Sequence, residues 1–204
     1  MEKFINLPAE KRNTIIDAAL AAFSANGYKK TSISDIAAAA GISKAMVFHY
    51  FGTKKELYLY LINLCCDIAM TAFNEKFDNA VTDFFDRIKL ATSIKISVIK
   101  IHPAILSFMG SMYFEKDDKV KADIQAIVAK YEGIRDRLAF DGMDASKFKD
   151  GIDPKLVMKI LVWFTEGYVS KSPMSAGLDI EAICREFDEC MNLLKNNFYK
   201  EEYV

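Results

Sequence analysis

Apolar residues recur along most of the chain at spacings of three and four positions, the spacing of helices that bury one face. The segment from about Ala9 to Asn26 is typical, with Ile15, Ala19 and Phe23 on one face. We find no convincing alternation of period two, which a half-buried strand would show. The pattern therefore predicts an all-α fold of about nine helices. The expected helices cover residues 9–26, 34–40, 44–50, 54–78, 81–101, 103–114, 120–138, 154–172 and 180–198.

Residues that begin or end helices separate these segments. Thr53 and Glu56 have the spacing of a capping box, in which each of the two side chains accepts a hydrogen bond from the other residue's backbone N–H. The polar residues 141–153 are expected to form a loop. The other signals are Asn26-Gly27 at a helix end and Pro103, Asp153-Pro154 and Asp179 at helix starts.

Residues 31–57, TSISDIAAAAGISKAMVFHYFGTKKEL, have the layout of a helix-turn-helix. Gly41 supplies the left-handed backbone position at which the first helix stops and the chain turns. The hydroxyl of Ser43 suits the N-cap of the second helix. A unit of this kind places its second helix in the major groove of DNA. Five small or apolar residues fall where the two crossing helices must touch: Ile36, Ala37, Ala40, Ile42 and Val47.

The charge distribution fits a DNA-binding N-terminal segment. The whole chain has a formal net charge of −1, which by itself does not indicate nucleic acid. Residues 1–56 contain eight Lys or Arg and five Asp or Glu, so this segment carries +3 and the remainder carries −4. A basic segment in front of an acidic one is typical of a DNA-binding domain joined to a domain with a different role.

Other protein classes find little support in the sequence. The four cysteines lack CxxC spacing and lie far from His49 and His102, so we expect no metal site and no cofactor. No nucleophile–base pairing or phosphate loop is visible, which argues against an enzyme. The N-terminus lacks the apolar core of a signal peptide. Asn63 and Asp67 interrupt the longest apolar run, so we expect a cytoplasmic protein with no membrane span.

The helix-turn-helix run and the preceding AALAAFSANGYKKT resemble the N-terminal domain of the tetracycline-repressor (TetR) family of bacterial transcriptional regulators. The resemblance covers roughly the first 60 residues. It implies a three-helix DNA-binding head, at residues 1–53, and a larger helical body, at residues 54–204. In that family the body usually binds a small molecule and forms a homodimer. The protein is usually a repressor that this molecule releases from a palindromic double-stranded operator.

The residues expected to touch DNA lie on and around the second helix of the motif. Val47 should face the core of the head, which leaves the other side of that helix for the groove. Many family members have tyrosine where this chain has Phe48, so a hydrogen bond to a phosphate is lost there. The resemblance places phosphate contacts at Tyr50 and Lys54. The full set of candidates is Thr31, Ser32, Ser43, Lys44, Ala45, Met46, Phe48, His49, Tyr50 and Lys54.

The body could bind a hydrophobic or amphipathic effector. Residues 103–114 and 154–172 are apolar on nearly every side, and Met and aromatic side chains can line an adaptable cavity. Plain core packing is the alternative reading of any one of these residues. A body that binds a protein partner instead, and an activator instead of a repressor, also stay open. The candidate pocket residues are His102, Ile105, Phe108, Met109, Met112, Tyr113, Trp163, Phe164 and Tyr168.

The last two long helices show more apolar surface than one packed face requires, which predicts that they pair with their symmetry mates in a homodimer. The helix from residue 54 to about 78 should be buried on several sides and should connect the DNA-binding head to the body. An effector releases DNA only if it binds the DNA-incompetent form more tightly.

Overall fold

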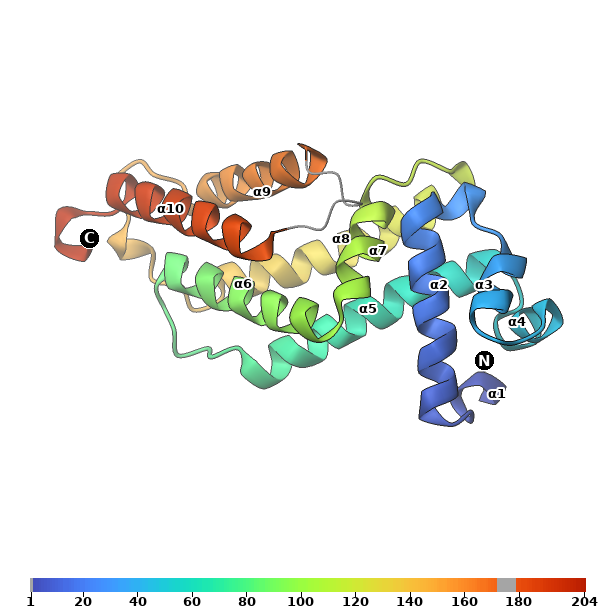
Figure 1. Ribbon diagram of the computed structural model, residues 1–204. Helices are drawn as coiled ribbons and strands as arrows, with labels where there is room; N and C mark the ends of the chain where they lie inside the picture. The colour runs from blue at the N-terminus through green and yellow to red at the C-terminus, as the bar shows by residue number, and fades with distance from the viewer. Residues whose placement is uncertain (1, 172–178) are drawn as a thin grey trace. The chain divides into compact units, whose positions relative to one another are not determined.

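The computed structural model describes residues 2–171 and 179–204 (Figure 1). This part of the chain contains ten α-helices and no strand beyond an isolated bridge between Phe148 and Tyr199. The predicted all-α fold is confirmed. The helices are α1 (Glu2–Ile5), α2 (Ala9–Lys30), α3 (Ile33–Ala39), α4 (Lys44–Phe51), α5 (Lys54–Lys76), α6 (Phe84–Ile101), α7 (Pro103–Tyr113), α8 (Asp118–Phe140), α9 (Pro154–Lys171) and α10 (Ile180–Phe198).

The nine expected helices are all present, and the tenth is the short α1. The side chain of Phe4 in α1 is fully buried, with its ring 4.6 Å from that of Phe51 and 5.8 Å from that of Tyr50. A four-residue helix is too short to hold itself in water, so this aromatic contact stabilises α1. The helical periodicity of so short a segment carries no signal, which is why the sequence did not predict it.

The expected capping box at the start of α5 is only half formed. The backbone N–H of Glu56 donates to Thr53 Oγ1 at 3.1 Å, as predicted. The N–H of Thr53 donates instead to the carbonyl of Phe51 at 3.0 Å, so the reciprocal bond to the Glu56 carboxylate is absent. The tight turn at Gly52 brings the carbonyl of Phe51 close to the N–H of Thr53, so this N–H bonds to the backbone and not to the Glu56 side chain. The caps expected at Ser43 and Asp179 are present.

By packing, the chain divides into two compact units. Unit 1 comprises Met1–Ala72 and Ser97–Glu132, and unit 2 comprises Phe73–Ile96 and Gly133–Val204. The helices α5, α6 and α8 contribute to both units. The division expected at residues 53/54 separates two functions rather than two packed bodies, and it stays a prediction.

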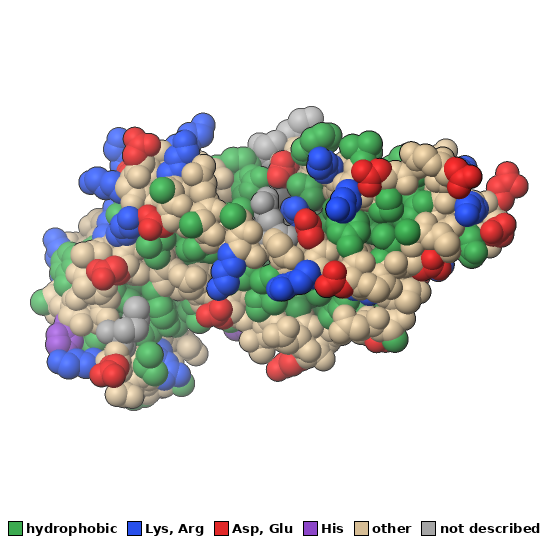
Figure 2. All heavy atoms as spheres, turned by 180° about the vertical axis from the view of Figure 1, so that it is seen from behind, with side chains coloured by type: hydrophobic (Ala, Val, Ile, Leu, Met, Phe, Trp, Pro, Cys, Tyr) green, Lys and Arg blue, Asp and Glu red, His purple; other side chains and the backbone are tan. Residues whose placement is uncertain are grey.

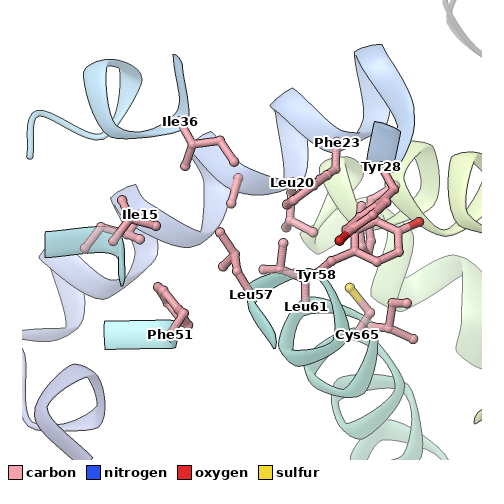
Figure 3. Close-up of a cluster of buried hydrophobic side chains, with 14 of the residues drawn as sticks. Ile15, Leu20, Phe23, Tyr28, Ile36, Phe51, Leu57, Tyr58, Leu61 and Cys65 are labelled. Carbon is pink, nitrogen blue, oxygen red and sulfur yellow. The ribbon is translucent and has the colours of Figure 1, made fainter. Parts of the chain in front are cut away.

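The core of unit 1 forms where α2 and α7 pack on the first half of α5. Figure 3 shows Leu57, Tyr58 and Leu61 of α5 facing apolar side chains of α2. The rings of Phe23, Tyr58 and Phe108 pack edge to face in this cluster. Burial of one such large side chain contributes about 1.5–3 kcal/mol to folding.

By length and hydropathy alone α5 is long and apolar enough to cross a membrane, in spite of Asn63 and Asp67. The expectation that these two residues exclude a span was wrong on that criterion. The apolar side chains of the first half of α5, such as Leu57 and Ile62, lie in the core of unit 1. This is the composition of a core helix, as the predicted burial on several sides requires.

The core of unit 2 gathers aromatic side chains from α6, the loop after α8 and the C-terminal residues. Beside it lies Asp83, whose carboxylate accepts hydrogen bonds from Lys147 at 3.0 Å and from the backbone N–H of Asp86 at 3.1 Å. Burial alone would raise the pKa of Asp83, but these bonds and the charges of Lys195 and Lys147 hold it below its ordinary value. The cap on α6 explains why this helix starts at Phe84 rather than at residue 81.

Candidate nucleic-acid interface

The turn between α3 and α4 depends on Gly41, which has a φ of 64°. The N–H of Ile42 donates to the carbonyl of Ala37 at 3.0 Å, and the N–H of Gly41 donates to the carbonyl of Ala38 at 3.2 Å. These bonds satisfy carbonyls at the end of α3. A Cβ at residue 41 would meet no atom within 4 Å, so the left-handed backbone, not crowding, is what requires glycine.

The α4 helix is held by one buried face and one cap. The Ser43 Oγ accepts a hydrogen bond from the N–H of Met46 at 3.2 Å, which confirms the predicted N-cap. Val47 is almost fully buried, as predicted, in the same core cluster as Ile36 and Ala37 of α3, and Ile42 is half-buried. The contact between the two helices fixes which side of α4 faces outward.

Four of the predicted DNA-contacting residues lie on that outward side. Lys44, Ala45, Phe48 and His49 are exposed, and Phe48 keeps 40% of its surface accessible to solvent. Met46 is half-buried against the core of the head. Lys44 is the first residue of α4, so its ammonium lies at the end that enters the groove in a helix-turn-helix.

Two other predicted DNA contacts are buried. Thr31 is 4% exposed, and its hydroxyl lies 2.6 Å from the carbonyl of Gly27 and 3.1 Å from that of Ala22. Tyr50 is also 4% exposed and packs on Phe4. Both side chains therefore belong to the structure of the head. A contact between either residue and DNA stays a prediction.

The last predicted contacts are partly engaged within the protein. The Ser32 Oγ accepts a hydrogen bond from the N–H of Ser34 at 3.1 Å, which caps α3 and leaves the hydroxyl proton as a donor. Lys54 donates to the carbonyl of Lys29 at 3.2 Å and lies over the ring of Tyr28. Burial lowers the pKa of Lys54, against the opposing effect of the acidic residues of the α7–α8 turn.

Figure 2 shows Lys and Arg side chains, with some Asp and Glu among them, at the end of the molecule that contains the helix-turn-helix, most densely at the top of the view. A duplex attracts such a surface because the binding of Lys and Arg to phosphates releases counterions. A surface hollow of about 540 Å³ beside α4 is lined by its exposed Phe48 and His49 and by Glu56 and Asn63 of α5. The site as a whole is a basic, partly aromatic helix face rather than a cleft for chemistry.

The predicted pocket residues are divided between the two units. Ile105, Phe108 and Met112 are buried in the core of unit 1, with Met109 packed against it. His102 is exposed, and so is Tyr113, which borders an open hollow of about 580 Å³ between the end of α7 and α8. Trp163 and Phe164 belong to unit 2, and the side chain of Tyr168 lies outside the described residues. A common pocket stays a prediction.

Within the described residues, no group of three or more His, Cys, Asp or Glu side chains is placed to hold a metal ion. The four cysteines are free thiols. The sequence missed two residues that matter for the head. The ring of Phe4 packs on Tyr50 of α4, and Glu115, which lies between two of the expected helices, accepts a hydrogen bond from the backbone N–H of Tyr28.

We expect Gly41→Ala to lower the free energy of unfolding by about 1 kcal/mol, because alanine disfavours the left-handed conformation. The matched control is Gly133→Ala, inside α8, where an added Cβ also meets no atom within 4 Å. That change should raise stability by about 0.5–1 kcal/mol. Chemical denaturation followed by circular dichroism measures both, and equal effects of the two changes would contradict the role given to the turn.

Three comparisons with known proteins agree with this geometry. Residues 15–61 match the model of the family described as "Bacterial regulatory proteins, tetR family". The chain is 24% identical over 157 residues to the fatty acid metabolism regulator protein of Bacillus subtilis (strain 168), which covers 72% of this chain and 75% of that protein. It is 38% identical over 56 residues to IcaR of Staphylococcus aureus (strain Newman), a negative transcriptional regulator of a biofilm operon, which covers 28% of this chain and 30% of that protein.

A solved structure extends the likeness to nearly the whole fold. The transcriptional regulator FadR from Bacillus subtilis, crystallised in complex with stearoyl-CoA, superposes with a TM-score of 0.69 at 19% identity and covers 88% of this chain and 96% of that one. The family match lies on the residues that build the helix-turn-helix, and the fold of the remainder is that of the same regulators. Together, the family match over residues 15–61 and the regulators similar in sequence support a DNA-binding transcriptional regulator of the tetR family.

Proposed function

We propose that this protein binds a palindromic operator as a homodimer, represses transcription and is released by a small amphipathic effector. The observation that carries the DNA-binding part is the exposed face of α4, held outward by the buried Val47. On this face Lys44 can donate to guanine acceptors or to a phosphate, and Ala45 permits close approach of the helix. Phe48 suits an apolar contact with a thymine methyl group, and His49 suits a phosphate.

The test is a mobility-shift titration of the full chain against its own upstream DNA at several salt concentrations. We expect binding that weakens steeply as salt rises. Lys44→Ala should weaken binding by about 1–2 kcal/mol, and it should lower the salt slope by about one if the ammonium contacts a phosphate. Lys100→Ala, an exposed lysine of α6 outside the proposed interface, is the control with the same charge change.

Equal loss in the two lysine variants would reject the α4 face as the contact surface. If the protein does not shift its upstream DNA, the operator is sought by selecting bound sequences from a pool of random duplexes. Failure of that selection at low salt would reject DNA binding by the isolated protein.

A second exposed face supports the homodimer. On α9, Val157 and Leu161 are buried in the core of unit 2, whereas Leu156, Ile160 and Trp163 keep 52%, 37% and 62% of their surfaces exposed. The three exposed residues follow the i, i+4, i+7 spacing of one helix face. A stripe of this kind is typical of an interface, and a symmetric partner covers it with its own copy. Two paired heads would then read two half-sites.

We expect Ile160→Glu to convert the dimer into a monomer, because the carboxylate would be buried against apolar surface. Light scattering should then report 23.0 kDa instead of twice that mass. The control is Ile5→Glu, the same change at a residue of α1 that is 56% exposed and lies outside the proposed interface. A wild-type protein that is monomeric at micromolar concentration would disprove the proposed interface.

The relatives support one class of effector. The solved FadR of Bacillus subtilis was crystallised with stearoyl-CoA, and the sequence relative from that species is a fatty acid metabolism regulator. We therefore propose a long-chain acyl thioester as the effector of this protein. A hundredfold decrease in operator affinity on binding requires about 2.7 kcal/mol of differential affinity between the two forms. The alternative is a body that binds a protein partner.

Stearoyl-CoA added to the preformed protein–DNA complex is expected to release the DNA at micromolar concentration and to raise the melting temperature of the free protein. Free coenzyme A is the control, since it lacks the apolar chain. If stearoyl-CoA neither releases DNA nor stabilises the protein, an acyl thioester is not the effector, and the protein-partner alternative gains support.

A further inference from the structure

The turn between α7 and α8 contacts α2 at Gly27 and Tyr28, where the regular helix of α2 is interrupted. There the carboxylate of Glu115 bridges two stretches of backbone that are 87 residues apart. Its Oε2 accepts a hydrogen bond from the N–H of Tyr28 at 2.6 Å. Its Oε1 accepts hydrogen bonds from the N–H groups of Lys116 and Asp117, both at 2.9 Å. One side chain thus holds its own turn and the end of α2 at the same time.

The local conformation explains why Tyr28 needs this partner. Gly27 has φ 66° and ψ 177°, so the helix is interrupted at this point. The interruption takes the N–H of Tyr28 out of the helical hydrogen-bond pattern. A carboxylate bonded to a backbone N–H makes a stronger bond than a neutral acceptor. A Cβ at residue 27 would lie 3.1 Å from the Glu115 carboxylate, so glycine also permits the close approach.

The segment that Glu115 holds leads directly into the DNA-binding motif. The ring of Tyr28 lies 5.2 Å from that of Tyr58 and under the ammonium of Lys54. The hydroxyl of Thr31 bonds to the carbonyl of Gly27 at 2.6 Å. The next residue, Ser32, is the N-cap of α3, and α3 packs on α4. The position of residues 27–31 therefore determines where α3 begins.

We propose that Glu115 is a positioning residue for DNA binding, which fixes the backbone before α3 to the α7–α8 turn and so keeps α3 and α4 in the arrangement that binds an operator. Glu115 does not belong to the helix-turn-helix, and it acts on DNA only through Tyr28 and α3. Its loss changes the population of the binding-competent arrangement. The inference rests on the proposed function, since it concerns the same DNA-binding surface.

Two substitutions separate this role from a general structural one. In Glu115→Gln one oxygen becomes an NH₂ group, so the side chain keeps its shape but an N–H faces another N–H on one of its two sides. In Glu115→Asp the shorter carboxylate can still accept from the N–H groups of its own turn, as aspartate does in turns, but it does not reach Tyr28. Glu115→Asp therefore breaks the link and leaves the turn capped. Glu115→Gln loses one of the two contacts and weakens the other, because a neutral amide oxygen is a weaker acceptor than a carboxylate.

The matched control is Asp123→Asn. The carboxylate of Asp123 pairs with Lys55 at 2.6 Å and likewise connects α8 with the start of α5. This pair joins two side chains that are 41% and 39% exposed, and exposed ion pairs contribute little. It tests whether any loss of a polar contact between these helices weakens DNA binding.

The experiment compares the full-length variants by hydrogen exchange at the Tyr28 amide and by affinity for the wild-type operator. For Glu115→Asp we expect exchange at the Tyr28 amide to become about tenfold faster, as the amide loses its protection, and for Glu115→Gln we expect a smaller increase. Operator affinity should fall by roughly fivefold, within the range of remote substitutions. Asp123→Asn should change both quantities by less than about twofold.

Several results would overturn the inference. Faster exchange at Tyr28 with unchanged operator affinity would mean that the hydrogen bond stabilises the protein but does not position α3 and α4 for DNA binding. Unchanged exchange would remove the bond from the solution structure, and an equal loss in Asp123→Asn would indicate general loosening. Should Glu115→Gln fail to fold, Glu115→Asp alone decides. A wild-type protein that binds no DNA rejects the proposed function itself, whereas wild-type binding matched by the variants rejects only this inference.

Discussion

The burial of the first half of α5 is the constraint on which unit 1 depends. Leu57, Leu61 and Ile62 are fully buried, and Tyr58 is nearly so, because α2 and α7 pack on this stretch. Several large side chains enclosed in this way outweigh any single polar contact of the unit by a wide margin. The polar contacts at its surface therefore do not hold the helices together. They select among arrangements that the apolar core already permits.

Both proposed interfaces follow the same rule. In α4 one buried residue, Val47, directs Lys44 and Phe48 outward, and in α9 the buried Val157 and Leu161 direct Ile160 and Trp163 outward. A helix of which one stripe is buried must present the residues of its opposite face to solvent. On α4 that face is basic and aromatic, which suits a duplex, and on α9 it is apolar, which suits another protein surface. The difference in composition, not in geometry, separates the two partners.

Local features of the fold could be predicted from the sequence. Gly41 and Ser43 specify the turn and the cap of the helix-turn-helix through the residues next to them, and both are confirmed. The contact between Glu115 and Tyr28 joins residues that are 87 positions apart, and the sequence around either residue contains no pattern that predicts it. Thr31 was predicted to face DNA because a hydroxyl near a helix start suits a phosphate. Its burial results from the break at Gly27, which offers a carbonyl inside the head.

The hydrogen bond between Glu115 and Tyr28 also suggests how a change in the body can reach the DNA-binding head. Glu115 contacts the segment before α3 and not the helix-turn-helix itself. The turn that carries Glu115 follows α7, and α7 packs on α2 through Phe108 and Phe23. The hydroxyl of Ser111 lies 3.3 Å from the carbonyl of Phe23, which adds a polar contact on the same side. A displacement of α7 would thus reach residues 27–31 both through the aromatic core and through the carboxylate. Of these two routes, the aromatic core resists displacement because its side chains are buried and moving them would open a cavity, whereas the carboxylate bond can break without opening one. A regulator that must change conformation at a cost of a few kcal/mol can therefore use the carboxylate hydrogen bond more readily than the aromatic core as its switch.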